Sequence, residues 1–136
     1  MAVTHKLFGP VMKNLGKIGD LETATITVNL MSSAYVFDQD SEYWASISTD
    51  EISTGTDYQP VTLSGKSMTY AARITTLSAT TSLFCSTGSI TAYFAVLKAS
   101  SYLMGCVDID GIEQSQDGIF KISWPGDEVL TFTVSG

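Results

Sequence analysis

Apolar and polar residues alternate in several short stretches of the chain. In ATITVNLM the apolar Ile26, Val28 and Leu30 are each separated by one polar residue, and EVLTFTV repeats the pattern at Leu130 and Phe132. This period of two is typical of a strand with one buried face. About eight such segments, separated by turn residues, predict an all-β fold, and we expect a single jelly-roll-like β-sandwich with one short helix.

Longer segments suggest how these strands are arranged. GSITAYFAVLKA is apolar on both faces, so we expect it at the centre of a sheet with YLMGCVDI as its neighbour. The pattern of residues 61–84 predicts two or three further strands, and it does not indicate which strands pair. DGIEQSQDG is expected to be a surface loop. IFKISW and EVLTFTV flank Pro125, Gly126 and Asp127, which predicts a hairpin.

The stretch VNLMSSAYVFDQDSEYWASI indicates a corner where a strand ends. Asp40 is a suitable N-cap, and Tyr43, Trp44 and Ile47 follow at helical spacing. The pattern therefore predicts one short helix near residues 40–47, with the aromatic side chains anchoring the corner to the sheet.

The N-terminal segment, residues 1–20, differs in charge from the expected β-sandwich body, residues 21–136. Residues 1–17 carry three lysines and no acid, and Gly9, Pro10 and Gly16 argue against a long regular helix. The segment is either an extended arm that lies on another protein or the first strand of the domain, and it could do both. The candidate partner-binding residues are Lys6, Leu7, Phe8, Val11, Met12, Lys13 and Lys17.

Composition narrows the class of protein. The 136 residues are 44% hydrophobic, which fits one domain with a core, and 34 of them are Ser or Thr, which favours strands and turns. The net charge of −7 argues against nucleic-acid binding. The longest apolar run, Ala92–Leu97, is too short to cross a bilayer, so we expect no membrane partner.

The sequence offers little for catalysis, and we expect no enzyme, cofactor or metal. His5 is the only histidine and Arg73 the only arginine, which excludes a histidine-based triad within one chain and argues against a phosphate clamp. Two groups of acids could attract calcium, but neither follows the EF-hand spacing, so we interpret them as loop acids and a helix cap. These acids are Asp38, Asp40, Glu42, Asp108 and Asp110.

Cys85 and Cys106 lie in apolar or serine-rich segments without CxxC spacing. We expect both to be buried free thiols in a protein that folds in a reducing compartment. A disulfide between them is the alternative.

Several stretches in order resemble capsid decoration, or cement, proteins of tailed bacteriophages, such as that of a Bordetella phage. They are HKLFGPVMKNL, VNLMSSAYVFDQDSEYW, ITAYFAVLK followed by GCVDI, and GIFKISWPGDEVLTFTV. The resemblance implies a jelly-roll-like, non-enzymatic protein on the outer surface of an HK97-type capsid, made in the bacterial cytoplasm. The implied partners are the major capsid protein and a second copy of the chain, as a homodimer on a two-fold axis.

Two other functions are compatible with the residues. A carbohydrate-binding β-sandwich, from a tail fibre or a secreted enzyme, would use exposed aromatic rings, and the candidates are Tyr35, Tyr43, Trp44 and Tyr58. A small hydrolase built on two carboxylates is the third hypothesis. Burial of Trp44 would favour a structural role, and its exposure in a groove would favour sugar binding.

Overall fold

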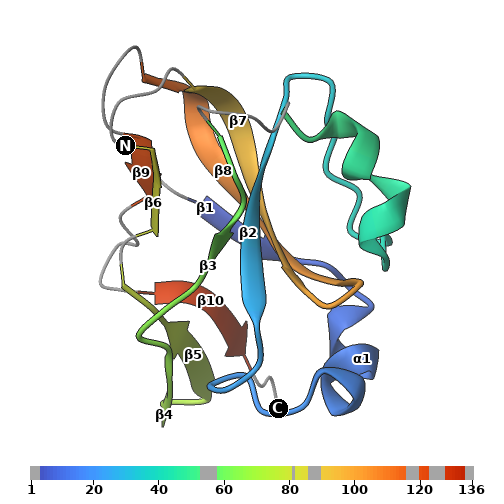
Figure 1. Cartoon of the computed structure of the whole chain (residues 1–136). Helices are drawn as coiled ribbons and strands as arrows, with labels where there is room; N and C mark the ends of the chain where they lie inside the picture. Colours follow the sequence, from blue (N-terminus) through green and yellow to red (C-terminus); the bar gives the residue numbers. More distant parts are fainter. Residues whose placement is uncertain are drawn as a thin grey trace.

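The structure is a computed structural model that describes residues 4–52, 58–80, 82–85, 90–115, 120–122 and 128–133 (Figure 1). Within these ranges the chain forms an all-β sandwich with one short α-helix, which confirms the predicted fold class. In the same ranges, no helix is long and apolar enough to cross a membrane.

The larger sheet has five strands, and every neighbouring pair is antiparallel. The strand predicted to be central does lie between two partners, and its expected neighbour pairs with it along most of its length. In spatial order the strands are β1 (Thr4–Leu7), β8 (Tyr102–Ser115), β7 (Ile90–Ala99), β2 (Ile26–Met31) and β3 (Val61–Thr62).

A second sheet of three strands packs against the first, and a separate pair of strands completes the described β-structure (Figure 1). The second sheet has the order β10 (Glu128–Thr133), β5 (Ile74–Ser78), β4 (Ser67–Ala71). The separate pair consists of β6 (Ser82–Cys85) and β9 (Phe120–Ile122). Residues 61–85 therefore contain four strands, one more than the sequence predicted at most.

The main hydrophobic core lies between the two sheets. Ile26, Val28 and Leu30 of β2 are fully buried there, as their alternation predicts, and they share the cluster with Leu77 of β5 and Leu130 of β10. Burying a side chain of this size contributes about 1.5–3 kcal/mol. The sequence pattern thus identified the face of β2 that holds the sandwich together.

A second, smaller cluster lies on the other face of the larger sheet. Ala95 and Leu97 of β7 belong to the main core, whereas the intervening Val96 is buried in the second cluster. This arrangement explains why β7 is apolar on both faces. The second cluster comprises Phe8, Met31, Tyr35, Ile47, Val96, Leu103 and Cys106, with Phe37, Trp44 and Phe94 packed against it.

Two strand predictions near the C-terminus are wrong. β9 and β10 do not form a hairpin, because β9 pairs with β6 and β10 pairs with β5. The apolar Val129 and Leu130 are fully buried against the larger sheet, which draws β10 into the second sheet. Residues 110–115, predicted as part of a loop, instead continue β8, because Ser115, Gln114 and Glu113 pair with the first residues of β7.

The helix predicted near residues 40–47 is also wrong. Only two short 3₁₀ turns occur there, at Trp44–Ser46 and Ser48–Asp50. Asp40 caps no helix; its own N–H donates to Oδ1 of Asp38, 3.0 Å away. The backbone of the corner is extended at Tyr43 (φ −116°, ψ 142°), and the Trp44 N–H donates to the Ser101 carbonyl, so no α-helix runs through residues 40–47.

The only α-helix in the described ranges is α1, Val11–Ile18, inside the segment where glycine and proline argued against a long helix. Pro10 occupies the N-cap position, where a missing N–H costs nothing. Gly19 ends the helix with φ 91°, and its N–H donates to the Leu15 carbonyl at 3.0 Å. The helix therefore fits between these residues at a length of eight.

Candidate functional site: a basic and aromatic surface

The structure separates the seven candidate partner-binding residues into core and surface residues. Phe8 and Val11 are fully buried, so the expectation that they lie on a contact surface is wrong. Leu7 is half-buried against the main core, and partner binding through it stays a prediction. Thr4–Leu7 pairs with β8, which supports the first-strand interpretation of the segment over a detached arm. Lys6, Met12, Lys13 and Lys17 are exposed, and partner binding through them stays a prediction.

Helix α1 is attached to the corner by a small polar cluster. Nζ of Lys13 lies 3.0 Å from Oε2 of Glu42, and the fully buried Asn14 donates from Nδ2 to the same oxygen at 3.0 Å. The hydrogen bond from Asn14, followed by Lys13, lowers the pKa of Glu42, and Glu42 in turn raises the pKa of Lys13. This cluster fixes the orientation of the lysines on α1 relative to the corner.

The corner is attached equally firmly to the turn between β7 and β8. The Leu103 N–H donates to the Glu42 carbonyl at 2.9 Å, and the Trp44 N–H donates to the Ser101 carbonyl at 2.9 Å. Tyr43 forms an isolated antiparallel bridge with Tyr102. Helix α1, the corner and the β7–β8 turn are therefore held as one continuous surface.

Two lysines lie over aromatic rings on this surface. Nζ of Lys17 lies 5.7 Å from the ring centre of Tyr102, and Nζ of Lys98 lies 5.7 Å from the ring of Trp44. The ring centres of Tyr43 and Tyr102 are 5.7 Å apart. Such distances allow cation–π attraction. We call the six residues Lys13, Lys17, Tyr43, Trp44, Lys98 and Tyr102 the basic–aromatic surface.

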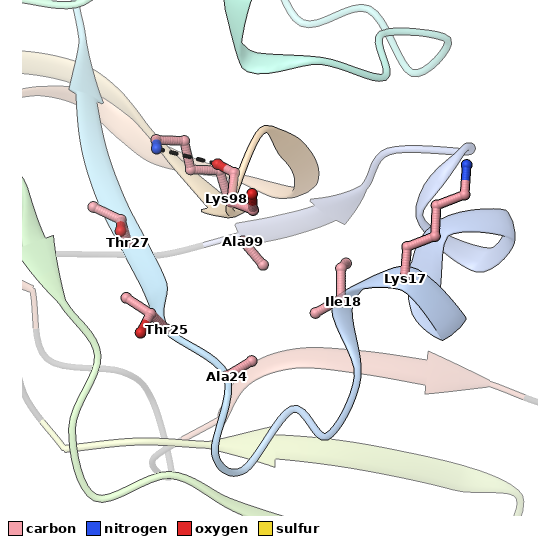
Figure 2. Close-up of a pocket in the computed structure, with 8 residues that line it drawn as sticks. Lys17, Ile18, Ala24, Thr25, Thr27, Lys98 and Ala99 are labelled. Atoms are coloured by element: carbon pink, nitrogen blue, oxygen red, sulfur yellow. Dashed lines mark hydrogen bonds between the residues drawn. The ribbon is translucent and has the colours of Figure 1, made fainter.

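A pocket of about 390 Å³ adjoins this surface between α1, the start of β2 and the β7–β8 turn (Figure 2). Figure 2 shows Lys17 and Lys98 on opposite sides of it. Apolar and hydroxyl side chains line the rest. Lys13 is the one lysine with an ion pair in the described part of the chain, so neither lysine of the pocket is neutralised there by a carboxylate. The lining residues are Lys17, Ile18, Ala24, Thr25, Thr27, Lys98, Ala99 and Ser100.

Half of the candidate sugar-binding aromatics are core residues. Tyr35 and Tyr58 are only 3% and 2% exposed, so the expectation that they line a groove is wrong. Tyr43 is 44% exposed, and Trp44 is half-buried against the second cluster. The exposure of Trp44 thus falls between the two outcomes that would have separated a structural role from sugar binding.

The candidate metal-binding acids do not converge on one point. Asp38 accepts a backbone hydrogen bond, and Glu42 is occupied by α1. Among the described residues no group of three or more His, Cys, Asp or Glu side chains could hold a metal ion. The side chain of Asp110 lies outside the described residues.

Cys106 is a free thiol, buried in the second cluster, as predicted; the side chain of Cys85 lies outside the described residues. Burial raises the pKa of Cys106 to about 12, so the thiolate form is scarce at neutral pH. Burial, followed by the neighbouring Cys106, also raises the pKa of Tyr35. Neither group is suited to act as a nucleophile at neutral pH.

Two residues of the basic–aromatic surface were missed by the sequence analysis. Lys98 and Tyr102 flank the turn between two apolar strands. Lys98 is the only charged residue between Arg73 and Asp108, which is a signal that could have drawn attention to it. Its position across the pocket from Lys17 depends on the fold, and the sequence alone gives no sign of it.

A comparison of the chain with protein-family models found no match, and searches of curated proteins and of solved structures found none either.

Proposed function

We propose that this protein is a non-enzymatic virion structural protein that decorates the outside of an HK97-type phage capsid and cements neighbouring capsomers. The resemblance of the ordered stretches described above suggests this class of protein. The observation that carries the proposal is the basic–aromatic surface, because it is rigidly held and positively charged on a protein of net charge −7. In this proposal the surface contacts acidic groups of the major capsid protein.

The chemistry of the surface suits a contact between proteins. Tyrosine and tryptophan rings are enriched at the centres of protein interfaces, whereas charged side chains such as lysine are suited to the polar rim. Here the rings of Tyr43 and Tyr102 supply apolar area, and Lys17 and Lys98 supply charge. Charged groups of this kind mainly set specificity and association rate, so the apolar rings contribute more of the affinity.

Cementing requires that one decoration unit hold two capsomers. In our proposal two copies form a homodimer on a two-fold axis of the shell, so that each copy presents its basic–aromatic surface to a different capsomer. Each contact can then be weak, because two linked contacts bind with a higher overall avidity than one.

The first test is quantitative mass spectrometry of purified particles of the phage that encodes the chain. The proposal requires a fixed copy ratio to the major capsid protein. Absence from the particles would contradict a virion role, and presence in tails but not heads would contradict a capsid role.

The second test measures binding to shells assembled without this protein. A Lys17→Glu, Lys98→Glu double variant should bind roughly tenfold more weakly or worse, because it repels acidic partner groups at every copy. The Lys17→Arg, Lys98→Arg variant keeps both charges and is the matched control. Equal occupancy of the shells by all three proteins would exclude the basic–aromatic surface as the attachment site.

A carbohydrate-binding module is the second candidate function, favoured by the exposed ring of Tyr43 and its neighbour Tyr102. It predicts binding to a glycan array that is lost on Tyr43→Ala and is insensitive to salt. The capsid proposal predicts shell binding that weakens as salt is added.

A further inference from the structure

Strand β4 forms an open edge of the second sheet. Its five residues pair with β5 on one side, and no described residue pairs with the other side. Four of the five residues are exposed, and Tyr70 is 66% exposed. The strand contains no charged residue, no proline and no bulge, which are the usual means of protecting an edge from further pairing.

The backbone geometry identifies which groups are open. Ala72 and Arg73 both have positive φ (50° and 71°) and connect Ala71 to its partner Ile74. A two-residue turn of this kind places a hydrogen-bonded pair next to the turn, and the bonding then alternates along the strand. The N–H and C=O groups of Ser67, Thr69 and Ala71 therefore face β5, and those of Met68 and Tyr70 face the open edge.

The inner face of the second sheet also extends beyond the core. Met68 lies opposite Leu77, and both side chains pack in the main core. Tyr70 is on the same face, opposite Thr75, yet most of its surface is exposed. An additional strand along β4 would satisfy the open backbone groups and cover part of the Tyr70 ring.

The charged residues near the β4 edge indicate which kind of additional strand would bind there. Residues 58–107 contain Lys66, Arg73 and Lys98 and no acid. If two copies paired antiparallel through β4 about Thr69, Lys66 of one copy would lie next to Arg73 of the other. Like charges across a pair of strands are destabilising, which disfavours a second copy. An extended segment with acidic ends is complementary in charge to Lys66 and Arg73.

We propose that β4 binds an extended, acidic segment of another protein, which adds to the second sheet as a fourth strand. Main-chain hydrogen bonds to Met68 and Tyr70 supply the affinity, and the charges of Lys66 and Arg73 favour acidic flanks. This inference does not depend on the proposed capsid function, because β4 is not part of the basic–aromatic surface on which that proposal rests.

The probe is a synthetic peptide of alternating threonine and valine with two glutamates at each end. It is added to ¹⁵N-labelled full-length protein, and amide shifts are followed by NMR. We expect saturable shifts at the Met68 and Tyr70 amides. The same peptide with lysines in place of the glutamates should bind roughly tenfold more weakly. Equal binding of the two peptides, or no shift at these amides, would overturn the proposal.

Two variants separate loss of the edge from loss of the fold. Tyr70→Pro removes an N–H that faces the open edge, a position where a strand tolerates proline, and should abolish binding while the amides of β7 keep their shifts. Tyr70→Thr keeps the N–H and should retain binding. Binding that survives Tyr70→Pro contradicts the proposal. Shifts in β4 that depend on protein concentration without peptide would instead indicate pairing with a second copy and overturn the acidic partner.

Discussion

Strands β2 and β4 both have an edge that is not fully paired with another strand. Side chains and loop backbone bond to the open part of the β2 edge, whereas the β4 edge has no such partners among the described residues. The short β3 pairs with β2 only at Thr27 and Val28. Elsewhere other groups bond to β2: the Leu30 N–H donates to the Tyr58 hydroxyl at 2.9 Å, and the Leu30 carbonyl accepts from the Ile52 N–H at 3.0 Å. Nothing described does the same for the outer side of β4.

The difference follows from what surrounds each edge. Leu30 is fully buried, so an unpaired N–H there would cost about 1–3 kcal/mol. The Tyr58 hydroxyl avoids this cost and donates its own hydrogen to Oε2 of Glu51 at 2.6 Å, while Asn29 donates to the same oxygen at 2.8 Å. The groups of β4 are exposed to water, which satisfies them at little cost. The backbone groups of a buried edge need hydrogen-bond partners from the same chain. Those of an exposed edge can bond to water and remain available to a strand from another protein.

The largest expected effect comes from removing the hydroxyl that closes the β2 edge. Tyr58→Phe should lower the free energy of unfolding by about 1–3 kcal/mol, because the buried Leu30 N–H loses its acceptor. Urea unfolding followed by fluorescence measures this loss. Burial, followed by Glu51, raises the pKa of Tyr58, so the hydroxyl stays protonated and the effect should be the same from pH 6 to pH 9.

The matched control is the same change at the open edge. Tyr70→Phe should alter the free energy of unfolding by no more than about 0.5 kcal/mol, because that ring is largely exposed. An equal decrease in the free energy of unfolding in both variants would show that closing the β2 edge does not contribute more to stability than the open β4 edge does.

A medium effect is expected at the turn that presents β4. Ala72 and Arg73 both adopt the left-handed conformation, which is unfavourable for residues with a Cβ. Replacing them together by Asn and Gly, the preferred pair for this turn, should raise the free energy of unfolding by about 0.5–1 kcal/mol. Ala71→Gly, next to the turn but within the strand, should lower it by a similar amount. Thermal melting of both variants tests the assigned turn.

The smallest effect is expected for a polar contact that is only partly buried. The pKa of Glu42 is lowered in the folded protein, chiefly by Asn14 and then by Lys13, so its contribution to stability is present at neutral pH and is lost as the pH falls through the folded pKa. Glu42→Gln should therefore unfold at a lower urea concentration than wild type at pH 7, and this difference should shrink as the pH is lowered toward 3.

The control for this pH dependence is Glu22→Gln, an exposed acid in the loop before β2. It should leave the difference between pH 7 and pH 3 close to that of wild type. If it reduces the difference as much as Glu42→Gln does, the effect reflects net charge and not the contact with α1.

The sequence by itself determined the fold class and the centre of the larger sheet. The alternation of Ile26, Val28 and Leu30 identified the buried face of β2, and the two apolar faces of β7 placed that strand between partners. Both are local patterns, and each depends only on how a strand exposes alternate side chains. The surface position of the three charged N-terminal candidates was also visible, since Lys6, Lys13 and Lys17 are all exposed.

Tertiary structure decided which local signals prevailed. The corner carries good helix signals, but its backbone bonds to Ser101 and Leu103 instead. The first segment carries a proline and two glycines, yet Val11, buried in the core, holds it as a helix. In both cases contacts between distant residues outweigh local propensities, which range from a few tenths of a kcal/mol for ordinary residues to about 1 kcal/mol for a glycine such as Gly16 inside α1.

The basic–aromatic surface and the open edge belong wholly to the tertiary structure. Lys17 and Lys98 are 81 positions apart in the chain, and they flank one pocket because α1 and the β7–β8 turn are both bonded to the corner. The free backbone groups of β2 need a side-chain partner because that strand is buried, whereas those of β4 do not because they are exposed to water. A single sequence records which residues can pair, and the free energy of burial in the folded chain selects the pairs that form.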